Sequence, residues 1–273
     1  MNAMNTTEMN ATAMNTTAGT TGVRSGAVGR LVRTELKLMV REPLTLIFVF
    51  VFPVVTMLII GGSFGTTPTV AFDWVNPSHW YVASYLTVVI AATGLIMVPV
   101  HLASYRERGV LRRFAAAGFP DWSFALAEVV TGLVAIIVGS VALLAVAAPV
   151  YGLPSAHHLV RVALGFGLGS VAFVAIGVLL GTVLPSARSA QAVGMVLFFP
   201  SFLLGSGGPP PHVMGTALRT IASYLPLTRV TDAVRGPWLG TGTATGSLLV
   251  VAGLAVAATL LAARCSSFPA VSR

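Results

Sequence analysis

Long apolar stretches separated by short polar segments dominate the pattern along this 273-residue chain. The stretches without Asp, Glu, Lys or Arg are residues 43–72, 74–105, 129–160, 162–187, 189–218 and 236–263. A helix needs roughly 20 apolar residues to cross about 30 Å of hydrocarbon, so each stretch is long enough for one span and none is long enough for two. The apolar runs also lack the alternation of membrane β-strands. The pattern therefore predicts an all-α membrane protein whose six transmembrane helices lie at about 44–62, 80–103, 123–150, 159–183, 190–206 and 246–264.

Composition supports the assignment to a membrane. Only 9% of the residues are charged and 55% are hydrophobic, whereas a soluble domain carries about 25% charged residues. The net charge of +8 does not indicate a nucleic-acid partner, because the cations cluster at the predicted membrane edges. The single cysteine, Cys265, excludes an internal disulfide framework.

The first 42 residues divide into two segments. Residues 1–26 are low-complexity sequence with repeated Met-Asn-Thr elements and no apolar core of a secretory signal, which predicts a disordered tail. Residues 27–42 predict an amphipathic helix that lies along the membrane surface. Its charged residues are Arg30, Arg33, Glu35, Lys37 and Arg41. Glu35 falls on the apolar face, where it either pairs with a cation of another segment or indicates that the helix is rotated. The membrane domain then covers residues 43–264, and residues 265–273 form a short tail.

The distribution of cations predicts the orientation. With the N-terminus inside, the cytosolic segments hold twelve Lys and Arg residues and the outer segments hold four: Arg161, Arg219, Arg229 and Arg235. Cytosolic loops carry the excess of cations, so both termini are expected in the cytosol.

The segment 105–120 is a charged island between two apolar spans. Six acidic and basic residues lie between Arg106 and Asp121. A cationic, helix-prone loop on the cytosolic side suits a membrane subunit that grips a soluble partner. The same arginines also have a simpler interpretation, in which they fix the topology and bind anionic lipid.

The last outer segment contains a second helical pattern. Residues 206–211 end the fifth span, and apolar residues then recur at helical spacing from Val213 to Leu225, which predicts a short amphipathic helix before the sixth span. Arg229, Asp232 and Arg235 follow it at spacings of three. These charges are interpreted either as ion pairs that cap the outer surface or as part of an exit gate.

The chain lacks the motifs of an enzyme. It has no P-loop, no His-Glu-x-x-His and no cysteine pair. Its eight carboxylates are scattered, and only Glu128 falls within a span. An ionisable group at that depth is costly. Glu128 either lines an internal cavity that contacts a cationic substrate, or it extends toward the membrane surface or is paired internally. The chain therefore predicts a permease-like membrane subunit driven by a separate protein, not an enzyme.

The order of these features resembles the membrane subunits of ABC-2-type exporters over about residues 25–264. The inner loop of that family reads Glu-x-Gly-Thr-Leu followed by basic and apolar residues and a proline. This chain has Glu107, Gly109 and Leu111 in that pattern and ends it at Pro120, with Val110 in place of the usual Thr. The Leu225-Pro226 pair, followed by 232–235, also resembles the last loop of the family.

The resemblance implies a permease domain with a cytosolic coupling helix that docks on a P-loop ATPase. The residues it assigns to ATPase coupling are Arg106, Glu107, Arg108, Gly109, Leu111, Arg112, Arg113 and Phe114. It implies a second permease subunit, as a homodimer or a heterodimer, in the plasma membrane of a bacterium. The partner ATPase would use ATP and Mg, and this chain would bind no cofactor.

The function it implies is ATP-driven export of an amphipathic or hydrophobic compound such as a drug, an antibiotic or a lipid, with antibiotic resistance as one outcome. The alternative is a membrane scaffold that anchors or regulates a cytosolic partner without transporting anything.

Overall fold

The computed structural model describes residues 33, 43, 47–110 and 121–265, and for 121–123 the backbone alone. Every regular element in that part of the chain is a helix. The predicted tail 1–26 and most of the predicted interfacial helix 27–42 lie outside the described residues, as do the coupling-loop residues 111–120 and the end of the chain from 266. Arg33 is described, and it is helical and exposed.

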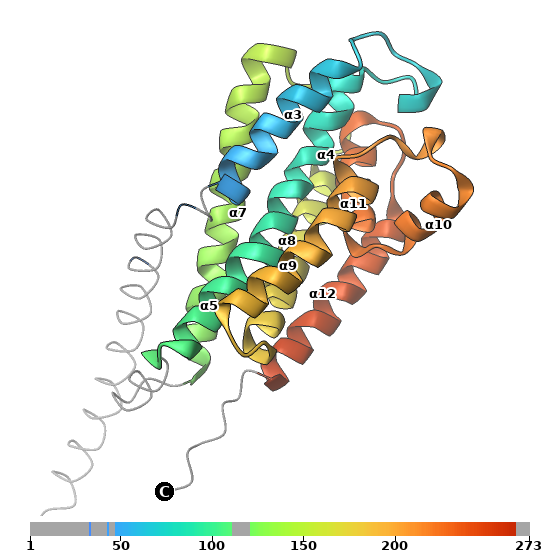
Figure 1. Cartoon of the computed structure of the whole chain (residues 1–273). Coiled ribbons are helices and arrows are strands. Elements are labelled where there is room, and N and C mark those ends of the chain that lie inside the picture. Colours follow the sequence, from blue (N-terminus) through green and yellow to red (C-terminus); the bar gives the residue numbers. More distant parts are fainter. Residues whose placement is uncertain (1–32, 34–42, 44–46, 111–120, 266–273) are drawn as a thin grey trace, which may run out of the picture.

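Six apolar helical segments build a bundle (Figure 1). In order, they are η1 Ile47–Val51 with α3 Phe52–Ser63; α4 Pro77–Ala92 with η3 Thr93–Met97 and α5 Val98–Glu107; α7 Asp121–Tyr151; α8 Leu159–Val183; α9 Ala187–Ser201 with η4 Phe202–Ser206; and α12 Thr245–Cys265. Five are long and apolar enough to cross a membrane, and Ile47–Ser63 is a shorter apolar helix. The all-helical membrane fold is therefore confirmed for the described residues, and the predicted span 159–183 has the same bounds as α8. That all six segments cross the membrane stays a prediction.

Irregular turns occur beside prolines in three of these segments. The π-helical turn η1 directly precedes Pro53, η3 contains Gly94 and precedes Pro99, and η4 follows Pro200. Proline has no backbone N–H, and its ring collides with the carbonyl one turn earlier. A π turn inserts an extra residue where regular α-helical bonding is interrupted.

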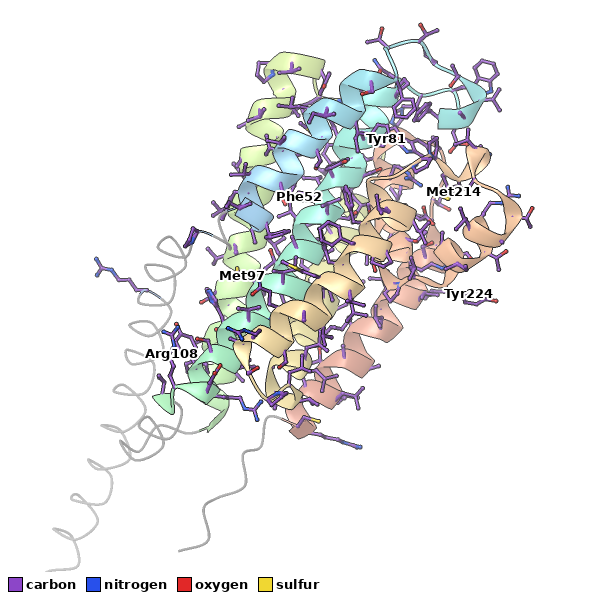
Figure 2. The ribbon with its side chains drawn as sticks, viewed as in Figure 1. Phe52, Tyr81, Met97, Arg108, Met214 and Tyr224 are labelled. Atoms are coloured by element: carbon purple, nitrogen blue, oxygen red, sulfur yellow. The ribbon has the colours of Figure 1, made fainter. Side chains whose placement is uncertain are left out.

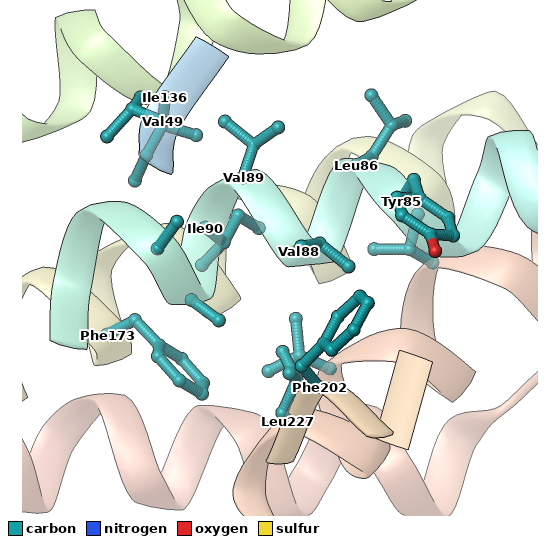
Figure 3. Close-up of a cluster of buried hydrophobic side chains, with 14 of the residues drawn as sticks. Val49, Tyr85, Leu86, Val88, Val89, Ile90, Ile136, Phe173, Phe202 and Leu227 are labelled. Carbon is teal, nitrogen blue, oxygen red and sulfur yellow. The ribbon is translucent and has the colours of Figure 1, made fainter. Parts of the chain in front are cut away.

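The α4 helix is the centre of the bundle. Nearly every residue from Pro77 to Val98 is buried, and α4 packs against α3, α7, α8 and α11. In Figure 3, Val88 and Ile90 of α4 lie near Phe173 of α8 and Leu227 of α11. A helix that is apolar on all sides belongs inside a bundle, so the helices around α4 have their remaining faces toward lipid or another subunit.

Glycines bring α8 into backbone contact with its neighbours. A Cβ atom built on Gly177 would lie 2.4 Å from the carbonyl oxygen of Gly94, and one on Gly165 would lie 2.5 Å from that of Ala233. Small residues allow such close approach between membrane helices. Gly165 and Gly169 face α11, whereas a Cβ on the intervening Gly167 would meet nothing within 4 Å.

Two short helices precede α12. They are α10 Thr216–Tyr224 and α11 Pro226–Leu239, with the small helical turns η2 Val70–Phe72 and η5 Pro211–Val213 nearby. The sequence predicted one amphipathic helix here, ended by Leu225-Pro226. The first helix does end there, but Pro226 also begins a second one, since proline suits the first turn of a helix. The structure thus has two helices in this segment. Figure 2 places Met214 and Tyr224 at the margin of the bundle, whereas most of α11 is buried against α4 and α8.

The two ends of the bundle carry different elements. The ends of α5 and α12 lie at one end, and the 64–76 loop lies at the other (Figure 1). Figure 2 shows Tyr81 and Arg108 near opposite ends of the long segment made by α4 and α5. The turns predicted to be cytosolic therefore gather on one side, which is called the inner end below.

Candidate functional sites

Arg106 and Glu107, at the end of α5, are bonded to the turn between α8 and α9. The Arg106 guanidinium nitrogen Nη1 donates to the carbonyl oxygens of Gly181 at 3.0 Å and Leu184 at 3.1 Å. The Glu107 carboxylate oxygen Oε2 accepts a hydrogen bond from the backbone N–H of Ala187 at 3.1 Å. A cation thus caps the carboxyl end of α8 and an anion caps the amino end of α9, which matches the dipoles of both helices.

The turn they hold is itself well capped. Ser186 precedes α9, and its side chain accepts from the N–H of Ser189, while the Ser189 hydroxyl accepts from the N–H of Ser186. This reciprocal pair is a capping box built from two serines. The turn is therefore a defined structure to which α5 is fastened.

The other predicted coupling residues are only partly described. Arg108 is exposed just after α5, and Gly109 has a φ of +69°. That left-handed conformation after a helix strongly favours glycine, which gives Gly109 a conformational reason for its place in the pattern. Leu111, Arg112, Arg113 and Phe114 lie outside the described residues, and their role as a coupling helix stays a prediction.

Glu128 lies in the interior with a histidine beside it. The side chains of His101 on α5 and Glu128 on α7 are 2% and 0% exposed, and His101 Nδ1 is 3.9 Å from Glu128 Oε1. Tyr105 packs edge-on against Phe124 on the inner side of this pair, with their ring centres 5.3 Å apart. His101 is therefore a candidate partner of Glu128, and whether Glu128 is paired internally or lines a substrate path stays a prediction. The sequence singled out Glu128 but missed His101 as its neighbour.

Arg235 forms a buried cluster between α11 and α4. Its Nη2 donates to Asp232 Oδ1 at 2.9 Å and its Nη1 donates to Ser84 Oγ at 3.3 Å. The guanidinium carbon lies 3.8 Å from the ring centre of Trp80, a cation–π arrangement. Among the described residues, Asp232 is within ion-pair distance of Arg235 and not of Arg229.

Burial perturbs both charges of this cluster. It raises the pKa of Asp232, an effect that the charges of Arg235 and Arg229 partly offset. Burial also lowers the pKa of Arg235, and the nearby Asp232 carboxylate opposes that change. Arg235 therefore depends on the Asp232 carboxylate for solvation that water supplies poorly at a buried site, whereas the Asp232 side chain, 35% exposed, still reaches water.

Three hydroxyl groups join the same helices one turn deeper. Thr87 Oγ1 lies 3.0 Å from Ser206 Oγ and 2.8 Å from Thr231 Oγ1, and Ser206 also contacts Thr231. All three are buried. They connect α4, η4 and α11, so the predicted gate segment is bonded to the core helix at two levels. This triangle could not be predicted from the sequence, because Ser and Thr inside a membrane helix usually bond to their own backbone.

Comparison with known proteins decides the family. A family model described as ABC-2 type transporter matches residues 27–238. The chain belongs to the ABC-2 type transporter family. It is also 22% identical over 171 residues to the "Probable multidrug ABC transporter permease YbhR" of Escherichia coli K12, an alignment that covers 61% of this chain and 46% of that protein. The counterpart in Escherichia coli O157:H7 matches equally. The match thus spans less than half the length of these relatives.

Within this ABC-2 chain, the described residues hold no group of three or more His, Cys, Asp and Glu side chains that would bind a metal ion. His212 Nε2 and Asp73 Oδ1 form an exposed pair at 2.9 Å that links η5 to the loop after η2. Polar contacts thus join helices at both ends of the bundle. Arg106 and Glu107 bond α5 to the α8–α9 turn at the inner end, and the Arg235 cluster joins α11 to α4 at the other end.

Proposed function

We propose that this chain is the membrane-spanning permease subunit of an ATP-binding-cassette exporter. In this account, a separate P-loop ATPase binds at the inner end and hydrolyses ATP with Mg, and two permease subunits form the transport path. The compound moved out of the cell is amphipathic or hydrophobic, and the membrane is the plasma membrane of a bacterium, with both termini of the chain in the cytosol.

Membership of the ABC-2 family carries this proposal. No P-loop motif occurs in the given sequence, which supports assigning ATP hydrolysis to a second protein. The relatives bear the name of a multidrug ABC transporter permease, which favours drug-like compounds. The exposed apolar residues of α3, α7, α9 and α12 fit faces that meet lipid or a second permease.

The position of α5 supports an inner coupling site. Its end leads directly into the segment 111–120, whose pattern matches the coupling loop of the family. Arg108 is exposed there and is available to an acidic surface on a partner. Arg106 is engaged inside the chain, so we assign partner contact to Arg108 and to the residues that follow it.

The test identifies a P-loop ATPase gene beside this one and co-purifies its product with the permease, both proteins being expressed in a host that lacks related exporters. The proposal expects a stable complex whose ATP hydrolysis depends on the permease. Replacing Leu111 with Ala, which removes one predicted apolar contact with the ATPase, is expected to uncouple hydrolysis from transport while the permease stays folded. Normal transport by Leu111→Ala would contradict the coupling assignment.

A further inference from the structure

The bonds made by Arg106 and Glu107 connect three membrane helices at the inner end. Arg106 is half-buried in the last turn of α5, and its guanidinium donates two hydrogen bonds to carbonyl groups at the end of α8. Glu107, the next residue, bonds to the first residue of α9. One end of α5 therefore holds both sides of the α8–α9 turn.

Charge strengthens both contacts, of which the Arg106 bonds are part-buried and the Glu107–Ala187 bond is exposed. A charged donor or acceptor makes a stronger hydrogen bond than a neutral one, and each charge has the sign that its helix end favours. Close packing continues along the same helices, since a Cβ on Gly181 would lie 3.0 Å from the carbonyl oxygen of Pro99 and 2.8 Å from the Cβ of Leu102. Such packed interfaces do not deform gradually, so α5 cannot shift at its inner end without displacing the α8–α9 turn.

The far end of α8 is fastened as well. Gly165 and Gly169 pack against α11, the helix that carries Asp232 and Arg235. Arg161 at the start of α8 donates to the carbonyl oxygen of Thr243 at 3.1 Å and to Thr245 Oγ1 at 3.2 Å. A displacement of α8 at its inner end thus reaches α11 along a continuous series of contacts.

We propose that Arg106 and Glu107 are positioning residues that transmit the movement of α5 to α8 and α9 during the transport cycle. They act within the permease and do not contact the ATPase. This inference rests on the proposed function, in which the ATPase moves the end of α5. It assigns the α8–α9 turn as the first part of the chain to respond.

The experiment follows the inner end of α9 with a fluorescent label. Arg188 is exposed in the first turn of α9, so bimane is attached to an Arg188→Cys, Cys265→Ser permease in complex with the ATPase in nanodiscs. The signal is compared without nucleotide and with ATP plus vanadate. An ATP-dependent change in bimane fluorescence is expected, and Glu107→Ala and Arg106→Gln are expected to lose it while ATPase binding is retained.

Two further variants separate transmission from a general loss of structure. Glu107→Gln keeps an oxygen that accepts from Ala187 and is expected to keep the change. Arg161→Gln removes a comparable bond between arginine and a carbonyl at the opposite end of α8, and it is expected to leave the change at α9 intact.

The outcomes distinguish this inference from the proposed function. Failure of the unaltered permease to bind the ATPase would contradict the proposed function itself. A complex that forms but shows no ATP-dependent change at α9, or a change that persists in Glu107→Ala and Arg106→Gln, would overturn the inference alone. Loss of ATPase binding in Arg106→Gln would also overturn it, since that result would place the side chain on the partner's surface.

Discussion

The guanidinium of Arg235 lies 3.8 Å above the ring of Trp80 and holds α11 against the central helix α4. Asp232 and Ser84 complete the cluster. The arrangement gives α11 a polar attachment to the buried helix α4. Arg229, the other arginine of the predicted gate, is not within ion-pair distance of Asp232.

Removing Asp232 is expected to destabilise this attachment. In Asp232→Ala, the buried Arg235 loses its carboxylate partner, and we expect the free energy of unfolding to fall by about 1–3 kcal/mol. Unfolding by SDS in mixed micelles, followed by tryptophan fluorescence, measures the change. The matched control is Arg229→Ala, for which a loss of about 1 kcal/mol or less is expected. Equal losses in the two variants would contradict the assigned pairing.

The backbone contact between α8 and η3 predicts that alanine substitutions at two glycines of α8 differ strongly in their effect on stability. Gly177→Ala places a methyl group 2.4 Å from the Gly94 carbonyl oxygen, and such overpacking costs about 1–3 kcal/mol. Gly167→Ala meets nothing within 4 Å, so that variant is expected to be as stable as the parent or slightly more stable. Thermal unfolding in one detergent compares the two. A Gly177→Ala protein as stable as Gly167→Ala would refute the close packing.

The His101–Glu128 pair predicts a non-additive double substitution. Removing one partner of a buried pair costs about 3–5 kcal/mol, whereas replacing both with apolar residues is often close to neutral. His101→Leu is therefore expected to be less stable than the double variant His101→Leu, Glu128→Leu. His158→Leu, at an exposed position, serves as the control. Additive losses would argue against pairing, and a Glu128→Gln variant of normal stability that no longer transports would instead favour the substrate-path interpretation.

The predicted orientation is tested by reporter fusions. The distribution of cations places Gly109 inside and His212 outside, so a fusion at Gly109 is expected to give a cytosolic signal and a fusion at His212 an external one. A cytosolic signal at His212 would reverse the ends of the bundle assigned here.

The apolar helices were predictable because hydrocarbon imposes a simple rule on sequence, and that all six cross the membrane stays a prediction. A segment that crosses it must be long, apolar and helical, and for α8 that rule gave the bounds of the helix itself. The second helix of the outer segment was missed for a local reason. Pro226 was interpreted as a stop, although a proline that ends one helix also suits the first turn of the next.

Side-chain contacts between helices could not be predicted from the pattern of apolar and polar residues. His101 lies five residues before Arg106, and Glu128 lies seven after Asp121, which places both about 7–11 Å along their helices from the inner edge at 1.5 Å per residue. Their similar depth could have suggested that the two residues are neighbours. Packing decides which helix faces meet, and the sequence pattern does not reveal it. For the same reason, Arg106 looked like a residue for a partner, whereas the folded chain directs it to the end of α8.

The central claim is that this chain transports in response to ATP hydrolysed by a partner. The most direct measurement uses inside-out membrane vesicles that contain the permease and its ATPase, offered a panel of amphipathic fluorescent dyes and drugs. The account predicts that ATP drives at least one compound into the vesicles, and that an ATPase variant lacking its P-loop lysine abolishes the uptake. A stable complex that hydrolyses ATP but accumulates none of the compounds would contradict the claim and favour a membrane scaffold.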